Sequence, residues 1–148
     1  MEPTVSAVAD LFRSVHQQLR EIVRDQDDET LNWSPGPDLN SIAVIVIHTL
    51  GSELDTLLFV RGIQSDRDRD AEFQVHANDA EMLLDAIDRA DAALIEHVSA
   101  ITANDLEATR TRPERDPQIG LHWLLNNYGH AREHLGHLHV TVQLRQQQ

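Results

Sequence analysis

The sequence of 148 residues contains no cysteine and no lysine. Without cysteine, the chain cannot form disulfides, ligate zinc through sulfur or use a cysteine nucleophile. Any metal site must therefore be built from nitrogen and oxygen ligands. The sequence also lacks a phosphate-binding P-loop and a Gly-x-Ser-x-Gly nucleophile elbow, which argues against two large enzyme classes.

Positive charge is scarce in this chain. The 12 basic residues, all arginine, stand against 25 acidic ones, so the formal net charge is −13 at pH 7. Such a chain repels a phosphate backbone, and we expect no nucleic-acid partner. The longest strictly apolar run, Ile42–Ile47, is far too short to cross a bilayer, and the start of the chain has no signal-peptide pattern. We therefore expect no membrane association and a cytoplasmic location.

The pattern of apolar residues indicates an all-α protein with one domain, residues 1–148. Spacings of three and four residues predict four amphipathic helices. The second is crowded with β-branched residues, so a buried strand is its alternative, but the helical spacing continues through Leu50, Leu54 and Leu57. Two connections, at 63–77 and 102–116, are long enough for crossovers. The predicted helices span residues 4–26, 41–62, 79–101 and Asp116-Pro117 to about Leu144.

Histidine is concentrated near the end of the chain. Five of the nine histidines lie between His122 and His139. His130, His134 and His137 stand at positions i, i+4 and i+7, so on a helix they share one narrow stripe. About eighty residues upstream, His48 sits inside the most apolar run. We interpret these residues as a three-histidine metal site inside a helical bundle.

Two simpler interpretations compete with a metal site. The histidine stripe lies roughly 130° from the core stripe of its helix, which contains Leu124, Leu125 and Leu135, so the histidines could form a solvated face. His48 could equally be a core histidine whose nitrogens are satisfied by neighbours. However, the histidine stripe begins with Ile119 and Trp123, and a face that changes from apolar to histidine is typical of a core that opens into a pocket.

The histidine stripe does not match the more specific metal-binding motifs. A zincin requires glutamate after the first histidine, where Ala131 stands. The inverted motif His-x-x-Glu-His is present at His130–His134, but no acidic residue follows to act as its third ligand. No Glu-x-x-His pair exists for a di-iron site. What remains is a mononuclear site with imidazole ligands, which suits zinc, nickel, iron or copper better than magnesium or calcium.

Three segments resemble the DinB/YfiT-like superfamily of candidate metalloenzymes. The first is Leu31-Asn32-Trp33-Ser34-Pro35 leading to Asn40-Ser41-Ile42-Ala43. The second is Ile47-His48 followed by Glu53, and the third is His130-x-x-x-His134-Leu135-Gly136-His137, which is similar to the family ending His-x-x-His-His-Arg-Gly-Gln. The order and spacing of these segments cover most of the chain.

The resemblance implies a four-helix bundle in which one histidine of the second helix and two of the fourth hold a metal. On this sequence these are His48, His130 and His134. His137 stands where the family often has glutamine or histidine, so we expect it to line the pocket or to substitute as a ligand. Glu133 and Leu135 depart from the family pattern, and the contacts around the ligands should differ accordingly.

The resemblance also suggests a function. Relatives include thiol-dependent transferases and isomerases, so we expect a divalent-metal enzyme that acts on a low-molecular-weight thiol or its conjugate, of the S-transferase type, or a hydrolase. Zinc or nickel is the expected metal, with iron as a further option, and a small thiol is the expected co-substrate. Arg61 or Arg132 could bind a carboxylate of that thiol. We also expect a homodimer. The alternative is a non-catalytic metal-binding or dimerising module.

Overall fold

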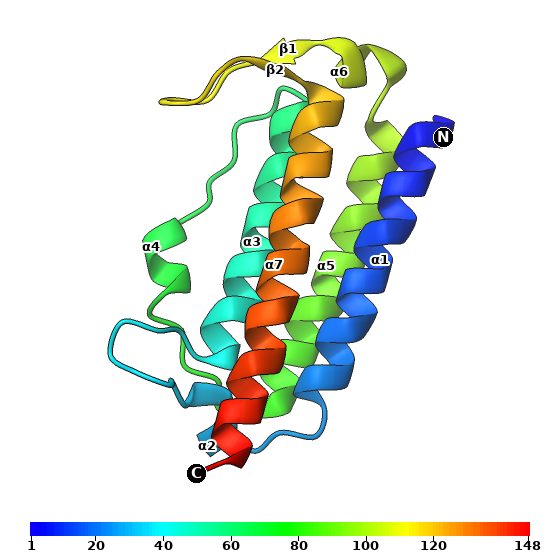
Figure 1. Cartoon of the computed structure of the whole chain (residues 1–148). Coiled ribbons are helices and arrows are strands. Elements are labelled where there is room, and N and C mark those ends of the chain that lie inside the picture. The colour runs from blue at the N-terminus through cyan, green and yellow to red at the C-terminus, as the bar shows by residue number, and fades with distance from the viewer.

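The computed structural model describes residues 1–148, and four long helices run side by side along its length (Figure 1). Each long helix contacts two neighbours, so that the order around the bundle is α1, α5, α3, α7. This arrangement confirms the predicted all-α four-helix bundle. The long helices are α1 (Pro3–Val23), α3 (Ile42–Val60), α5 (Ala80–Ala100) and α7 (Gly120–Gln146).

The connections carry short elements of their own. Between α3 and α5, the chain returns along the whole length of the bundle, whereas the segment between α5 and α7 stays at one end (Figure 1). That second segment contains a two-stranded antiparallel ladder in which Thr109 pairs with Ile119. The short elements are α2 (Asp28–Asn32), α4 (Arg69–Glu72), α6 (Ala103–Glu107), β1 (Thr109–Arg110) and β2 (Gln118–Ile119).

The apolar run at the start of α3 is helical, not the alternative strand. Ser41 caps it, because its hydroxyl oxygen accepts a hydrogen bond from the Val44 amide at 3.2 Å. By length and composition α3 could span a membrane, with a mean hydropathy of 1.6, but 56% of that window is buried within the bundle. Packing against the neighbouring helices therefore accounts for its apolar character.

Helix α7 begins later than the sequence indicates. An acidic residue followed by proline at Asp116-Pro117 is a common helix start, yet the helix begins at Gly120. The intervening residues are drawn into the ladder with β1, and the Gly120 amide donates to the Ala108 carbonyl at 3.0 Å. The Trp123 indole adds hydrogen bonds to the carbonyls of Arg110 and Gln118. Pairing with a distant segment thus overrides the local signal for a helix.

The bundle core is divided into two apolar clusters. One contains 17 buried residues and includes the first half of α3, and the other contains 12 and includes its last turns. Along the long helices the transition between the clusters is marked by polar side chains, all of which take part in hydrogen bonds: His16, Glu53, Asp91 and Asn127. Leu54 and Leu125, expected in the core, are instead 38% and 48% exposed.

Candidate functional site

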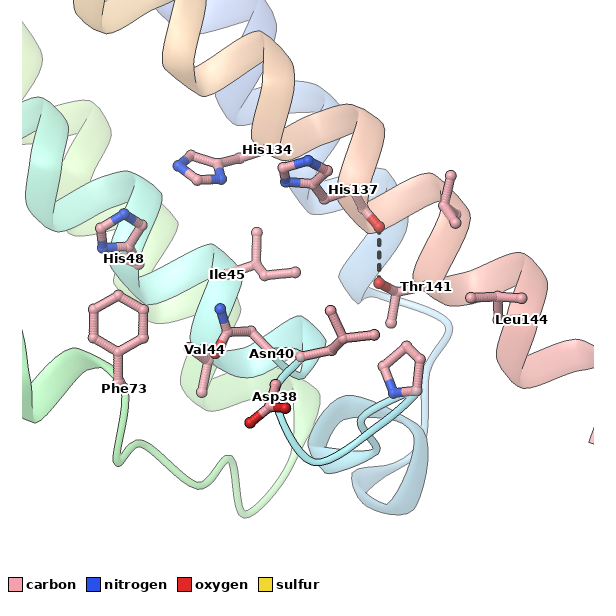
Figure 2. A pocket seen from close by; sticks show the side chains of 13 residues that line it. Asp38, Asn40, Val44, Ile45, His48, Phe73, His134, His137, Thr141 and Leu144 are labelled. Atoms are coloured by element: carbon pink, nitrogen blue, oxygen red, sulfur yellow. Dashed lines mark hydrogen bonds between the residues drawn. The ribbon is translucent and has the colours of Figure 1, made fainter.

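A cavity of about 360 Å³ opens between the first half of α3 and the second half of α7. Figure 2 shows the rings of His48, His134 and His137 facing one side of this cavity, with Asp38 and Asn40 on the connecting segment below them in this view. The cavity is lined by Pro35, Asp38, Leu39, Asn40, Val44, Ile45, His48, Phe73, His134, His137, Val140, Thr141 and Leu144.

Two antiparallel helices bring the histidines together. The ring of His48, from α3, lies edge to face with that of His134, from α7, at a centroid separation of 5.1 Å. The centroids of His134 and His137 are 5.8 Å apart. Two imidazoles on one transition-metal ion hold their ring centres about 5 Å apart, given metal–nitrogen bonds of about 2 Å. The His48–His134 and His134–His137 pairs are therefore each near this ring spacing.

The Glu72 carboxylate contacts ring nitrogen Nδ1 of His48. This Nδ1 lies 3.0 Å from Glu72 Oε1 and 3.4 Å from the Arg67 guanidinium. The carboxylate requires Nδ1 to donate, whereas the guanidinium would require it to accept, and the shorter contact decides for donation. In the neutral ring Nε2 then carries the lone pair. A carboxylate that orients a histidine in this way is the usual outer partner of a metal-ligating imidazole.

Glu72 is itself fixed on two sides. Arg67 binds both of its oxygens, with Nε to Oε2 and Nη2 to Oε1 each at 2.8 Å. On the other side lies Gly51, three residues after His48 on α3. A Cβ on Gly51 would overlap Glu72 Oε2 and lie 2.9 Å from its Cδ. The missing side chain at position 51 therefore creates the space for the carboxylate behind His48.

His134 is uncharged at neutral pH. Burial, together with the nearby His48 and His137 rings, lowers the pKa of His134 to about 4. An uncharged imidazole is the form that binds a metal, and no proton has to leave His134 at pH 7 for it to act as a ligand. This property follows from the half-buried position of the ring on the helix face that packs against α3.

His130 lies apart from the cavity. Its side chain is 51% exposed and its Nδ1 is 3.6 Å from the Glu133 carboxylate, so the ring faces its own helix surface. In the described conformation no three histidine or acidic side chains are positioned to hold one ion. The role of His130 as a ligand stays a prediction that requires its side chain to turn. His137 lines the cavity, and its role as a substitute ligand stays a prediction.

The chemistry of the donors nonetheless suits a transition metal. His48 has an oriented, available Nε2, and His134 carries no charge at neutral pH. Two further histidines, His130 and His137, flank His134 on α7. Nitrogen ligands from two rigid helices at the wall of an open cavity fit zinc, nickel or iron, and they do not fit magnesium or calcium.

The two arginines considered for carboxylate binding do not line the cavity. Arg61 follows the last residue of α3, where its Nη1 lies 2.7 Å from His97 Nδ1. Arg132 is exposed on α7, next to the buried Ala131. Neither belongs to the cavity wall. The cavity therefore has no guanidinium with which to bind an anionic group.

A second histidine centre, buried between α1, α3 and α5, was not apparent from the sequence. His16 is fully buried; its Nδ1 lies 2.6 Å from Asp91 and its Nε2 lies 2.8 Å from Glu53. Arg20 pairs with Asp91 and with Asp88. Burial by itself would lower the pKa of His16, but hydrogen bonds and charge interactions with Glu53 and Asp91 outweigh it and raise that pKa. The cluster lies outside the cavity and joins α1 to α3 and α5 through His16.

The local sequence did not predict the contacts of His16 and Glu72. His16 follows an apolar residue on an ordinary amphipathic helix, and Glu72 lies in a charged connection that resembles a solvated loop. The one available signal was Gly51, because a glycine inside a helical pattern costs about 1 kcal/mol relative to alanine and often has a packing reason.

The family model for the DinB superfamily matches residues 11–138. The chain belongs to the DinB superfamily. The match includes all of α3 and α5, most of α1 and α7, and the histidines of the cavity, and it ends before the cavity residues Val140, Thr141 and Leu144. Among curated proteins, none matches this DinB-superfamily chain significantly.

Solved structures support the fold of this DinB-superfamily protein. A conserved protein from Enterococcus faecalis is similar with a TM-score of 0.80 and 14% identity, covering 97% of both chains. A DinB-like protein from Bacillus subtilis has a TM-score of 0.71 and 18% identity, covering 95% of this chain and 91% of that one. A DinB-like protein from Bacillus cereus has a TM-score of 0.71 and 15% identity, covering 90% and 89%. At these identities the similarity concerns the fold.

Proposed function

We propose that this DinB-superfamily protein is a metal-dependent enzyme that acts on a low-molecular-weight thiol or its conjugate. The reaction is of the S-transferase type, with hydrolysis as a variant of the same chemistry. The observation that supports this proposal is the gathering of His48, His134 and His137 at the wall of a cavity open to solvent. A structural metal site would instead be closed by protein ligands, whereas a catalytic site keeps an open position for substrate.

The residues that would hold the ion are His48 and His134, with His130 as the third ligand that the family resemblance implies and His137 as its substitute. A divalent transition ion, zinc or nickel first and iron next, would supply a Lewis acid that keeps a thiol sulfur ionised at neutral pH. Glu72 accepts a hydrogen bond from Nδ1 of His48 and so selects the neutral tautomer whose Nε2 lone pair would bind the ion. The cavity holds the remainder of the substrate beside these rings.

A non-catalytic module is the second candidate. Several large apolar side chains outside the cavity are exposed, including Leu11 at 40%, Ile95 at 52% and Leu125 at 48%. Such residues could belong to an interface between two copies of the chain, and metal binding would then serve assembly. A homodimer is compatible with either function, because the cavity is formed within one chain.

The first test is the metal content of tag-free protein, measured by inductively coupled plasma mass spectrometry. We expect about one equivalent of a transition metal per chain in the wild type and its loss in His48→Ala and His134→Ala. Parallel measurements on His130→Ala and His137→Ala identify the third ligand, because only the true ligand should match the loss in the other two. His139→Ala, an exposed histidine of α7 outside the cavity, is the control and should retain metal.

Absence of metal from the wild type, even after incubation with zinc or nickel, would refute the proposed enzyme. Metal that is retained equally by all five variants would refute the assignment of the site. Circular dichroism on each variant separates loss of metal from loss of fold.

A further inference from the structure

A row of interacting side chains extends from His48 along one face of α3. Asp55 and Phe59 stand seven and eleven residues after His48, so both lie within about 20° of its direction around the helix. At about 1.5 Å of rise per residue, Asp55 lies about 10 Å along the helix axis from His48. Two arginines from connecting segments meet this face: Arg67 from the residues before α4, and Arg112 from the residues between β1 and β2.

All three guanidinium nitrogens of Arg67 face carboxylates. Nε and Nη2 each lie 2.8 Å from an oxygen of Glu72, and Nη1 lies 4.0 Å from Oδ2 of Asp55. Arg67 belongs to an irregular stretch of the chain, so no helix of its own sets its position. Of its two acidic partners, only Asp55 is part of a long helix. Asp55 therefore ties this arginine to the rigid frame of the bundle.

Asp55 is in turn fixed by Arg112. Its Oδ2 accepts a hydrogen bond from Nη1 of Arg112 at 3.0 Å, and the Arg112 guanidinium carbon lies 4.0 Å from the centre of the Phe59 ring. One carboxylate oxygen thus lies between two guanidinium groups. The Asp55 and Arg67 side chains are each only 17% exposed, so salt screens this interaction less than it would on an open surface.

Arg67 also contacts Nδ1 of His48, the nitrogen that faces Glu72. Its Nη2 lies 3.4 Å from this Nδ1, compared with 2.8 Å from Glu72 Oε1. A guanidinium can only donate, so a closer contact with Nδ1 would require that nitrogen to accept and would place the ring proton on Nε2. A protonated Nε2 cannot bind a metal ion. The position of Arg67 therefore decides whether Nδ1 donates to the carboxylate or accepts from the guanidinium.

We propose that Asp55 is a positioning residue of the candidate metal site. Its carboxylate holds Nη1 of Arg67, which keeps this arginine on Glu72 and leaves Nδ1 of His48 as a donor and Nε2 as the free ligand atom. This inference rests on the proposed function, because His48 is a ligand of the same site. Asp55 does not line the cavity, and it acts only through Arg67 and Glu72.

The ring proton of His48 can be located directly. Long-range proton–nitrogen NMR correlations of the metal-free protein at about pH 8, where an ordinary histidine is neutral, distinguish the two tautomers. We expect the proton on Nδ1 in the wild type and a mixture with the Nε2-protonated ring in Asp55→Asn, which keeps the size of the side chain and loses its charge. Asp55→Glu restores the charge and should restore the wild-type tautomer. The spectrum of His48→Gln identifies the His48 signals.

Zinc affinity gives the second measurement. Competition with a chelator should show a zinc dissociation constant about three- to tenfold higher in Asp55→Asn, which is less than the 10- to 100-fold typical for loss of a direct partner of a ligand. Asp105→Asn is the matched control. The Asp105 side chain is 19% exposed, lies 3.6 Å from Arg110 and is outside the cavity. Its substitution removes a similar ion pair and should change neither the tautomer nor the zinc affinity.

Three NMR results would overturn the positioning role: a proton on Nε2 of His48 in the wild type, an unchanged tautomer in Asp55→Asn, or the same change in Asp105→Asn. So would an Asp55→Glu protein that behaves like Asp55→Asn, or zinc binding that is equally tight in Asp55→Asn and the wild type.

The tautomer is measured without metal, so this inference and the proposed function fail separately. A tautomer change in a protein that binds no zinc would refute the proposed function and leave the orientation of His48 by Asp55 established. Zinc binding with an unchanged tautomer would refute the positioning role alone.

Discussion

The His48 side chain has two different surroundings on its two ring nitrogens. Nδ1 faces the Glu72 carboxylate at 3.0 Å, while the ring lines the cavity beside His134. The position of His48 in an apolar helix could be predicted from the sequence. Its carboxylate partner could not, because Glu72 is separated from it by 24 positions and lies on a different element.

At this scale we predict that Glu72→Gln weakens metal binding. The amide keeps the size of the carboxylate but loses the charge that orients His48 and pairs with Arg67. Loss of such a partner typically costs 10- to 100-fold in metal affinity, and we expect about this change in the zinc dissociation constant. Competition titration against a chromogenic chelator measures it.

The control is Glu29→Gln, at an 83% exposed carboxylate that contacts only the distant Arg145. It should leave the dissociation constant unchanged. If Glu72→Gln binds zinc as the wild type does, Glu72 has no orienting role.

At the scale of elements, the short helix α4 is part of the site because α3 has a glycine facing it. Gly51 lies one helical turn from His48, and the Glu72 carboxylate occupies the space where a side chain would be. A glycine inside a helix costs about 1 kcal/mol relative to alanine, and the packing of α4 against α3 is its compensation here. The length of the 63–77 connection was evident from the sequence, but its approach to α3 was not.

We predict opposite effects for alanine at two helical glycines. Gly51→Ala should displace Glu72 and lower both the zinc affinity and the melting temperature. Gly129→Ala, in α7, meets no atom within 4 Å of the added Cβ. It should raise the free energy of unfolding by about 0.5–1 kcal/mol, because alanine is the better helix former.

Chemical denaturation with paired zinc titrations measures both quantities. A Gly51→Ala protein as stable as Gly129→Ala, with unchanged zinc affinity, would show that α4 does not depend on this close approach.

At the scale of the whole molecule, a buried charged layer joins three of the four long helices. His16 from α1 lies between Glu53 of α3 and Asp91 of α5, and both of its nitrogens face carboxylates. Both nitrogens can donate only when the ring is protonated, and the raised pKa of His16 favours this form. The layer lies between the two apolar clusters of the core. Removing one member of a buried ion pair typically lowers the free energy of unfolding by about 3–5 kcal/mol, so substitutions in this layer should be strongly destabilising.

This layer should make the protein less stable at alkaline pH. The pKa of His16 is raised in the folded state, so its stabilising contribution is complete below its unfolded value of about 6.5 and is lost as the pH rises through the raised value. The pKa of Glu53 is raised by burial, which also favours the lower pH. On the acid side, the pKa of Asp91, which burial alone would raise, is lowered by His16 and Arg20, so stability is also lost at low pH.

Urea denaturation between pH 6 and 10 measures the alkaline loss. His16→Gln should be less stable at pH 6 and should show a flatter dependence on pH above it, because the amide does not titrate. His139→Gln, an exposed histidine, should follow the wild type. An unchanged slope in His16→Gln would assign the alkaline loss to other groups.

The sequence by itself determined the helical elements and the family. Apolar spacing is a local property of a helix, so the four long helices and the all-α class follow from it, and the spaced segments around His48 and His134 identify the DinB superfamily. Two features departed from the pattern that the apolar spacing predicts, and each departure has a physical cause. The start of α7 was set by pairing with β1, and the exposure of Leu54 and Leu125 was set by which neighbours cover each helix.

Only the tertiary structure decided which histidines meet and what surrounds them. Helical periodicity puts His130, His134 and His137 on one stripe, but it does not say which of them face α3. The antiparallel packing of α3 and α7 brings His134 and His137 to the cavity with His48 and leaves His130 half exposed. The partners of His48 and His16 come from other elements, because side chains far apart in the sequence become neighbours only when the helices pack.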